Sequence, residues 1–219
     1  MLATALLLSG CWAPGTSPGP LAEQTAPPEV DVAAAEKAML GIAPGADTGL
    51  EVIDETGTTY PTFGSDWSEI DHDANRLARV SRGLTSPGWA DASGPGFYAV
   101  FELVLMEDAR AADGAIHDIS TTARNPYTFD GEDGAPTTEY EGVREPVRSD
   151  WPLGSIERDV RLVWDDGSRA SGWVVYTTSG PYAAVVWGAA VPDDASHTAM
   201  DAFFEEHLPR FIDGFRGLA

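Results

Sequence analysis

Three strand-like segments joined by two very short turns occupy residues 157–190, and they restrict the fold more than any other part of the sequence. Residues 157–164 alternate polar and apolar side chains, which predicts a strand with one buried face. The segments at 172–178 and 182–190 are rich in apolar residues, and each follows a short turn that contains glycine. Because connections this short join only antiparallel neighbours, this part of the chain predicts an antiparallel sheet.

The remaining sequence from residue 30 onward supplies more strands and three helices. Residues 97–106 form a long and almost wholly apolar run, which predicts a central strand. A final helix is predicted after Pro192, and Pro209 inside it is expected to kink or split it because proline lacks an N–H group. The other strands are expected at 50–54, 58–63 and 76–82, and the other helices at 32–40 and 108–123. Antiparallel strands with helices segregated from them predict an α+β fold, in which helices pack on the sheet.

Two stretches of the chain carry turn residues and no periodic pattern. Residues 83–96 are rich in glycine and proline, and we expect a loop there. Residues 124–150 combine three turn signals with many charged side chains, which predicts an irregular excursion from the sheet.

The N-terminal segment indicates export and lipid attachment. Residues 2–8 are apolar but shorter than the ~20 residues that span a bilayer, which is typical of the hydrophobic region of a secretion signal. Leu8-Ser9-Gly10-Cys11 resembles the bacterial lipobox, in which a leucine and two small residues precede a cysteine that receives diacylglycerol. The resemblance implies a membrane partner, namely a lipid anchor at Cys11 on the outer face of the cell membrane, and hence an extracytoplasmic location.

The chain then divides into three parts by composition. Residues 1–10 are expected to be the signal peptide, and residues 11–29, with five prolines, a disordered tether that begins at the lipidated cysteine. Residues 30–219 form a single α+β domain. The first basic residue is Lys37, whereas a signal peptide begins with basic residues, so the natural start is expected a few residues upstream or the fragment was trimmed.

Charge and cysteine content exclude several classes of protein. The chain has a formal net charge of −22, which argues against nucleic acid as a partner because phosphate binding depends on Lys and Arg. A single cysteine excludes an internal disulfide and a zinc site built from several thiolates.

The order of elements resembles the PsbP-like superfamily, which also holds Lpq-type lipoproteins of actinobacteria. The matching pieces are the entry at Gly64–Trp67, the strand 97–106 with its alanine-rich helix, the meander 160–190 and the closing helix after Pro192. The resemblance implies an α/β/α sandwich that serves as a non-catalytic binding or assembly module. No catalytic residue carries over from the family.

Tryptophans in loops are the candidate ligand-binding residues. Trp89 and Trp151 lie in segments rich in glycine and proline, where an aromatic side chain can edge a ligand cleft or simply pin a loop to the body. Trp164, by contrast, shares an alternating face with apolar neighbours and is expected in the core.

The polar residues form no coherent catalytic or metal-binding set. Residues 71–75 imitate the start of a calcium loop, but Arg76 and Arg82 occupy the positions where that loop needs glycine and glutamate. His197 and His207 are ten residues apart on one helix, which is not a metal-binding spacing. The acidic residues 130–133 are interpreted as a solvated loop, and His117 as an exposed residue.

The sequence therefore predicts a non-catalytic module that has no metal or cofactor and binds an unidentified protein or small molecule. Two alternatives stay open. One is an extracytoplasmic hydrolase centred on His72 or His197, and the other is a carrier of a small ligand or cation.

Overall fold

The computed structural model describes residues 30–56, 76–91, 94–122, 125–129, 136–146 and 150–219. The signal peptide, Cys11, the tether, the strand expected at 58–63 and the polar stretch 71–75 with His72 lie outside these ranges, as do residues 130–133.

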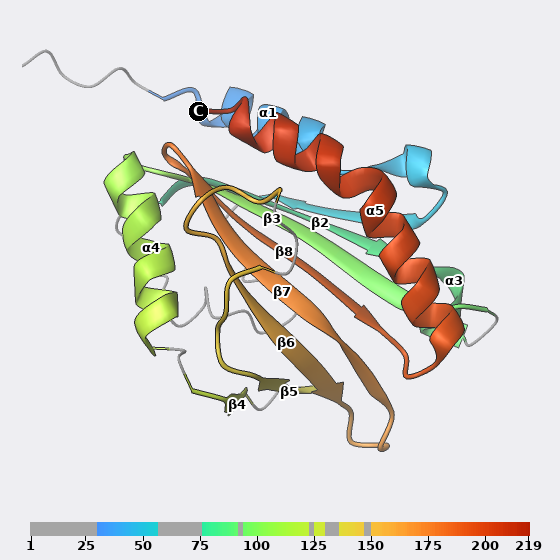
Figure 1. The fold of residues 1–219 in the computed structure, drawn as a ribbon. Coiled ribbons are helices and arrows are strands. Elements are labelled where there is room, and N and C mark those ends of the chain that lie inside the picture. The colour runs from blue at the N-terminus through green and yellow to red at the C-terminus, as the bar shows by residue number, and fades with distance from the viewer. Residues whose placement is uncertain (1–29, 57–75, 92–93, 123–124, 130–135, 147–149) are drawn as a thin grey trace, which may run out of the picture.

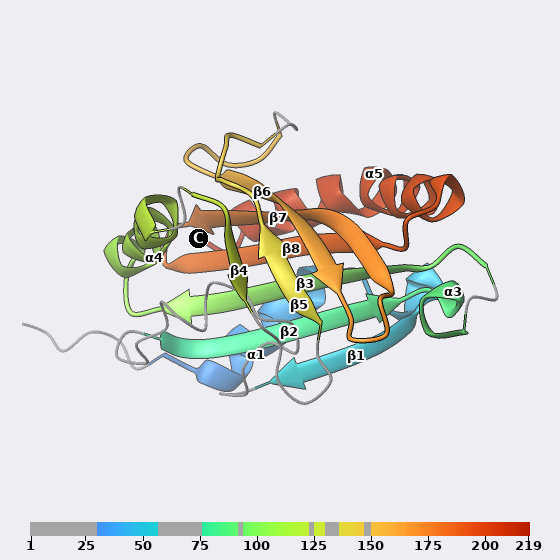
Figure 2. The same cartoon turned by 90° about the horizontal axis from the view of Figure 1, so that it is seen from below.

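Eight antiparallel strands form one sheet in the order β1-β2-β3-β8-β7-β6-β5-β4 (Figures 1 and 2). The strands are β1 Glu51–Thr56, β2 Arg76–Thr85, β3 Phe97–Met106, β4 Tyr127–Phe129, β5 Thr137–Tyr140, β6 Ile156–Val163, β7 Arg169–Ser179 and β8 Tyr182–Ala190. The three strands of the meander and the long apolar strand β3 lie where the sequence predicted them. β3 pairs with β2 on one side and β8 on the other, and every residue in it except Met106 is buried.

Helices cover both faces of this sheet, which confirms the α+β class and gives the predicted α/β/α arrangement (Figure 1). The helices are α1 Val32–Ile42, α3 Pro87–Asp91, α4 Ala109–Thr122 and α5 Asp194–Arg216, with a 3₁₀ turn η1 at Ala46–Thr48. α1 and α5 pack on one face with the odd-numbered side chains of β3, whereas α4 packs on the opposite face with side chains such as Val100 and Val104. We call these the α5 face and the α4 face.

The α5 face holds an aromatic core. Phe101 in the middle of β3 is fully buried, and its ring contacts the rings of three phenylalanines of α5 at centroid distances of 4.9–6.5 Å. These are Phe203, Phe204 and Phe211. The phenylalanines on one face of α5 therefore cover the central strands.

The expected break of the last helix at Pro209 is wrong, because α5 runs without interruption from Asp194 to Arg216. Pro209 can donate no hydrogen bond to the carbonyl of Glu205, one turn earlier. Both residues are exposed, so water can solvate that carbonyl while the opposite side of the helix stays packed.

The irregular excursion predicted at 124–150 is also wrong in part. Its residues include β4 and β5, which extend the sheet beyond β6. These strands are only three and four residues long, so they lack the length that makes alternation visible in a sequence. The loop expected at 83–96 is shorter than predicted, because β2 continues to Thr85 and α3 follows it.

Gly188 on β8 allows α5 to approach the sheet. A Cβ atom at this position would lie 2.4 Å from Cε2 of Phe204 and 3.0 Å from Sδ of Met200. We expect Gly188→Ala to lower the free energy of unfolding by about 1–3 kcal/mol through overpacking. Gly114→Ala in α4 is the matched control. Apart from the backbone of α4 itself, no heavy atom lies within 4 Å of a Cβ atom placed there, so alanine should stabilise the helix by about 0.5–1 kcal/mol. Urea unfolding of both variants checks the opposite signs, and two changes of the same sign would contradict this packing.

Candidate functional site: a polar groove beside α5

The site is built on a β-bulge in the segment that follows β5 and pairs with β6. Tyr140 pairs with Val160, and the backbone N–H of Glu141 donates to the carbonyl of Asp159. The next pairing joins Arg144 to Glu157. Residues 142 and 143 therefore oppose the single residue Arg158, which is the pattern of a β-bulge.

The bulge decides which way the following side chains point. Without the extra residue, strict alternation after the inward-facing Tyr140 would place Arg144 on the α4 face. With it, Val143 packs into the core of the α4 face and Arg144 contacts carboxylates on the α5 face.

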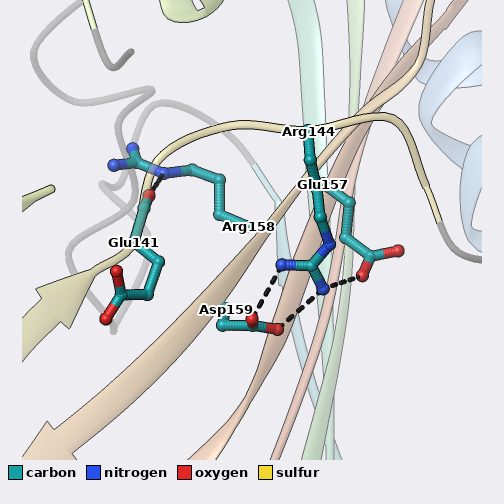
Figure 3. Close-up of polar contacts among 5 residues, drawn as sticks. All are labelled: Glu141, Arg144, Glu157, Arg158 and Asp159. Atoms are coloured by element: carbon teal, nitrogen blue, oxygen red, sulfur yellow. Dashed lines mark hydrogen bonds and ion pairs between the residues drawn. The ribbon is translucent and has the colours of Figure 1, made fainter. Parts of the chain in front are cut away.

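Arg144 forms a dense ion-pair network on the α5 face (Figure 3). Its guanidinium donates to both carboxylate oxygens of Asp159, at 2.7 and 2.8 Å, and to Oε1 of Glu157 at 2.6 Å. The hydrogen bond to Asp159, with further contributions from Glu157, raises the pKa of Arg144 above its ordinary value. The Glu157 side chain is 7% exposed, so one member of the network is anchored in the interior.

A second arginine holds the bulge from the other face. Arg158 is fully buried, and in Figure 3 it points away from Arg144. Its Nε donates to the carbonyl of Glu141 at 2.7 Å, and its guanidinium lies 4.8 Å from the centroid of the Tyr140 ring. The bulge is therefore fixed by one arginine on each face of the sheet.

Glu141, Arg144 and Asp159 line a groove of about 700 Å³ beside α5. Its floor comes from β5, β6 and β7, one wall comes from the first two turns of α5, and the other from residues 141–144. The polar lining side chains are Glu139, Glu141, Arg144, Asp159, Arg161, Ser171, His197 and Asp201, and the larger apolar ones are Trp173 and Met200. Arg161 pairs with Glu139 at 2.9 Å, so both guanidiniums of the lining are engaged with carboxylates.

Ser171 on the floor of the groove lies next to His197 on the wall formed by α5. The distance from Oγ of Ser171 to Nε2 of His197 is 3.4 Å. Within the described residues, no carboxylate is hydrogen-bonded to the imidazole of His197, so this pair lacks the group that orients the base in a catalytic triad.

The start of α5, which carries His197, is fixed by its cap. The Asp193 carboxylate accepts from the hydroxyl of Ser196 at 2.7 Å and from its backbone N–H at 2.8 Å. The Ser196 oxygen in turn accepts from the backbone N–H of Gly96, which precedes β3. This chain of bonds ties the groove wall to the central strand.

The cap predicts a pH dependence of stability. The hydrogen bonds from the Ser196 hydroxyl and backbone lower the pKa of Asp193 below its ordinary value. Its stabilising effect is therefore complete above the ordinary aspartate pKa of about 3.9, and is lost as the pH falls through the lowered value. We expect Asp193→Ala to lower the urea midpoint at pH 7 and to differ little from wild type near pH 2. The neighbouring Asp194→Ala is the control, and an equal deficit at both pH values would contradict the assignment.

The tryptophans proposed from the sequence do not meet in this groove. The Trp89 ring on α3 lies 5.9 Å from the Tyr98 ring and 5.8 Å from the Trp164 ring, on the α4 face. Trp151 is 6% exposed and belongs to the core of the α5 face. The structure thus separates the two residues, and each packs a loop against the sheet. Trp164 is partly buried against the α4-face core.

Of the three histidines in the part of the chain that the structure describes, His197 alone lines the groove. His117 is exposed on α4, as expected, and His207 packs its ring against Phe203 at 4.7 Å. In the described ranges, no group of three or more His, Cys, Asp and Glu side chains is arranged to hold a metal ion. Nor does any helix among them have the length and apolar composition to cross a membrane.

Comparisons with known proteins give little beyond this geometry. No protein-family model matches the sequence, and no curated protein matches it. Among solved structures, the chain is similar to the extracellular domain of PknH from Mycobacterium tuberculosis. The TM-score is 0.48 at 10% sequence identity, over 86% of this chain and 92% of that one.

Proposed function

We propose that this chain is an extracytoplasmic lipoprotein whose domain is a non-catalytic binding module. The anchor is a lipid on Cys11, which holds the tether and domain at the outer face of the cell membrane. The ligand site is the groove beside α5. One observation carries the binding proposal. A groove of ligand size is lined by Arg144, whose guanidinium is held by Asp159, and the bulge that carries Arg144 is held from the other face of the sheet by Arg158.

A fixed network favours binding for an entropic reason. Binding immobilises flexible side chains at a cost of about 0.5–1.5 kcal/mol each. Arg144 and Asp159 are already held by two parallel hydrogen bonds, so the free-energy cost of ordering these side chains on binding is smaller. Preorganisation of this kind is expected in a binding site.

The anchor is tested by metabolic labelling with a palmitate analogue. We expect the full chain to be labelled and Cys11→Ala to be unlabelled, because Cys11 is the only cysteine in the sequence. Ser9→Ala keeps a small residue in the lipobox and serves as the matched control, which should still be labelled. Equal labelling of wild type and Cys11→Ala would overturn the anchor.

Binding is tested by thermal unfolding of the full chain with a panel of small molecules. The panel holds neutral trisaccharides, polyamines such as cadaverine and spermidine, and carboxylates such as citrate. A ligand at one hundred times its Kd stabilises the folded state by about 2.7 kcal/mol, or roughly 5–10 °C in Tm for a chain of this size. We expect such a shift from at least one member, and a loss of that shift in Arg144→Gln. A panel without any shift would contradict a small-molecule site.

The contact between Ser171 and His197 favours a second candidate, an extracytoplasmic hydrolase. A serine-directed fluorophosphonate probe separates the two functions. A binding module should remain unlabelled, whereas labelling of the wild type that is absent from Ser171→Ala would favour the hydrolase.

A further inference from the structure

The pair formed by Arg144 and Asp159 offers donors and acceptors side by side. A guanidinium has five N–H donors, and three of those of Arg144 are used by Asp159 and Glu157. Two donors remain. Each oxygen of Asp159 accepts one of these bonds and keeps a second lone pair, and both residues line the groove.

The side of the groove formed by β7 and α5 also offers hydrogen-bond donors and acceptors side by side. The hydroxyl of Ser171 can donate and accept, and the ring of His197 has one nitrogen of each kind when neutral. Trp173 lies on the same strand as Ser171 and two residues beyond it, so both point to the α5 face. Its partly exposed indole, beside Met200, gives the groove apolar surface between the polar groups.

The charges of the lining disfavour charged ligands. Four carboxylates and two guanidiniums line the groove, and both guanidiniums already bind carboxylates, so an anion would meet a negative field. The two carboxylates outside these pairs, Glu141 and Asp201, are exposed. Exposed carboxylates attract a cation weakly because water and salt screen them.

A sugar fits this combination of groups. Each sugar hydroxyl both donates and accepts, so neighbouring hydroxyls can donate to a carboxylate oxygen and accept from an arginine N–H. The C–H faces of a sugar ring are apolar and can lie on an indole. The groove volume of about 700 Å³ is in the range that small ligands occupy.

We therefore propose that the groove binds a neutral, polyhydroxylated ligand, namely a short oligosaccharide. The proposal rests on the proposed function, since it names the ligand class of the same groove. Asp159 and Arg144 would hold neighbouring hydroxyls, Ser171 and His197 would hold others, and Trp173 would contact the ring.

Calorimetric titration of the full chain tests the ligand class. The neutral probes are maltotriose, cellotriose, mannotriose and chitotriose, and the charged probes are spermidine and citrate. We expect at least one trisaccharide to bind and neither charged probe to compete with it. Asp159→Asn and Arg144→Lys should each weaken the trisaccharide at least tenfold, because asparagine is a weaker acceptor and lysine lacks the fork of donors.

Two controls keep the result interpretable. Asp159 is half-exposed, so Asp159→Asn should fold, and circular dichroism with thermal unfolding verifies this. Asp165→Asn, at the exposed turn between β6 and β7, makes the same chemical change away from the groove and should bind as wild type does.

Three outcomes would overturn the inference. Binding of spermidine or citrate at the groove, without binding of any trisaccharide, would leave the binding module intact and reject the sugar. Trisaccharide binding that is unchanged in Asp159→Asn and Arg144→Lys would place the sugar elsewhere. Absence of binding by all four trisaccharides would also reject the sugar.

Discussion

Replacing Phe101 with alanine is expected to lower the free energy of unfolding by about 3–5 kcal/mol. Phe101 is fully buried in the central strand β3, and three phenylalanine rings of α5 surround it. The substitution removes the ring from all three contacts and leaves a cavity that the packed helix cannot readily fill. Urea unfolding at pH 7 measures the change.

The control is Leu153→Ala, since the Leu153 side chain is fully exposed. Its effect should lie within about 0.5 kcal/mol of wild type. A loss below about 1 kcal/mol for Phe101→Ala would mean that α5 is not packed on β3 in solution, and the wall of the groove would then be misplaced.

Arg79→Met is expected to cost about 3–5 kcal/mol of stability. Arg79 on β2 donates from Nε to Oε1 of Glu102 on β3 at 2.7 Å, and both side chains are 3% exposed. Methionine fills similar space but removes the charge that compensates the buried carboxylate. Urea unfolding is again the measurement.

Arg161→Met is the matched control, because it makes the same substitution in an exposed pair. Arg161 and Glu139 are also joined at 2.9 Å, but their side chains are 58% and 44% exposed. Exposed pairs contribute about 0–1 kcal/mol, so this variant should unfold nearly as the wild type does. Equal losses for the two variants would contradict the difference in burial.

The parts of the fold that the sequence predicted are those with strong local signals. Gly167 and Gly180 sit in the two turns of the meander with positive φ angles of 83° and 56°, the conformation that glycine adopts most readily. Asp31 caps α1, and its side chain accepts from the N–H of Ala34 at 3.0 Å. Turns and caps depend on few neighbouring residues, so they can be read from a short window.

The groove could be predicted only in part. Alternation in β6 already places Glu157, Asp159 and Arg161 on one face, so the polar floor was visible in the sequence. Arg144 was not, because an extra residue in the segment after β5 reverses the direction of its side chain. That bulge depends on pairing with β6, a dozen residues later in the chain. A tertiary contact of this kind leaves no local pattern.

The tryptophans show why an aromatic residue of the groove is hard to identify from sequence. Trp89 and Trp151 drew attention because they lack strand context, yet Trp173, which lines the groove, lies within a predicted strand. The partial exposure of Trp173 depends on how much of the sheet α5 covers, which the sequence of β7 does not indicate. α5 packs on β3 and β8, whereas β5, β6 and β7 contribute the floor of the open groove.

The location of a bound ligand tests the binding module most directly. The panel member with the largest Tm shift is added to the full chain, and backbone amide chemical shifts are recorded during the titration. The changes in chemical shift map the site residue by residue. We predict that the shifts gather at Glu139, Arg144, Asp159, Ser171, Trp173 and His197. Shifts that gather on the α4 face around Trp89 and Trp164, or that spread without a centre, would contradict a binding site in the groove beside α5.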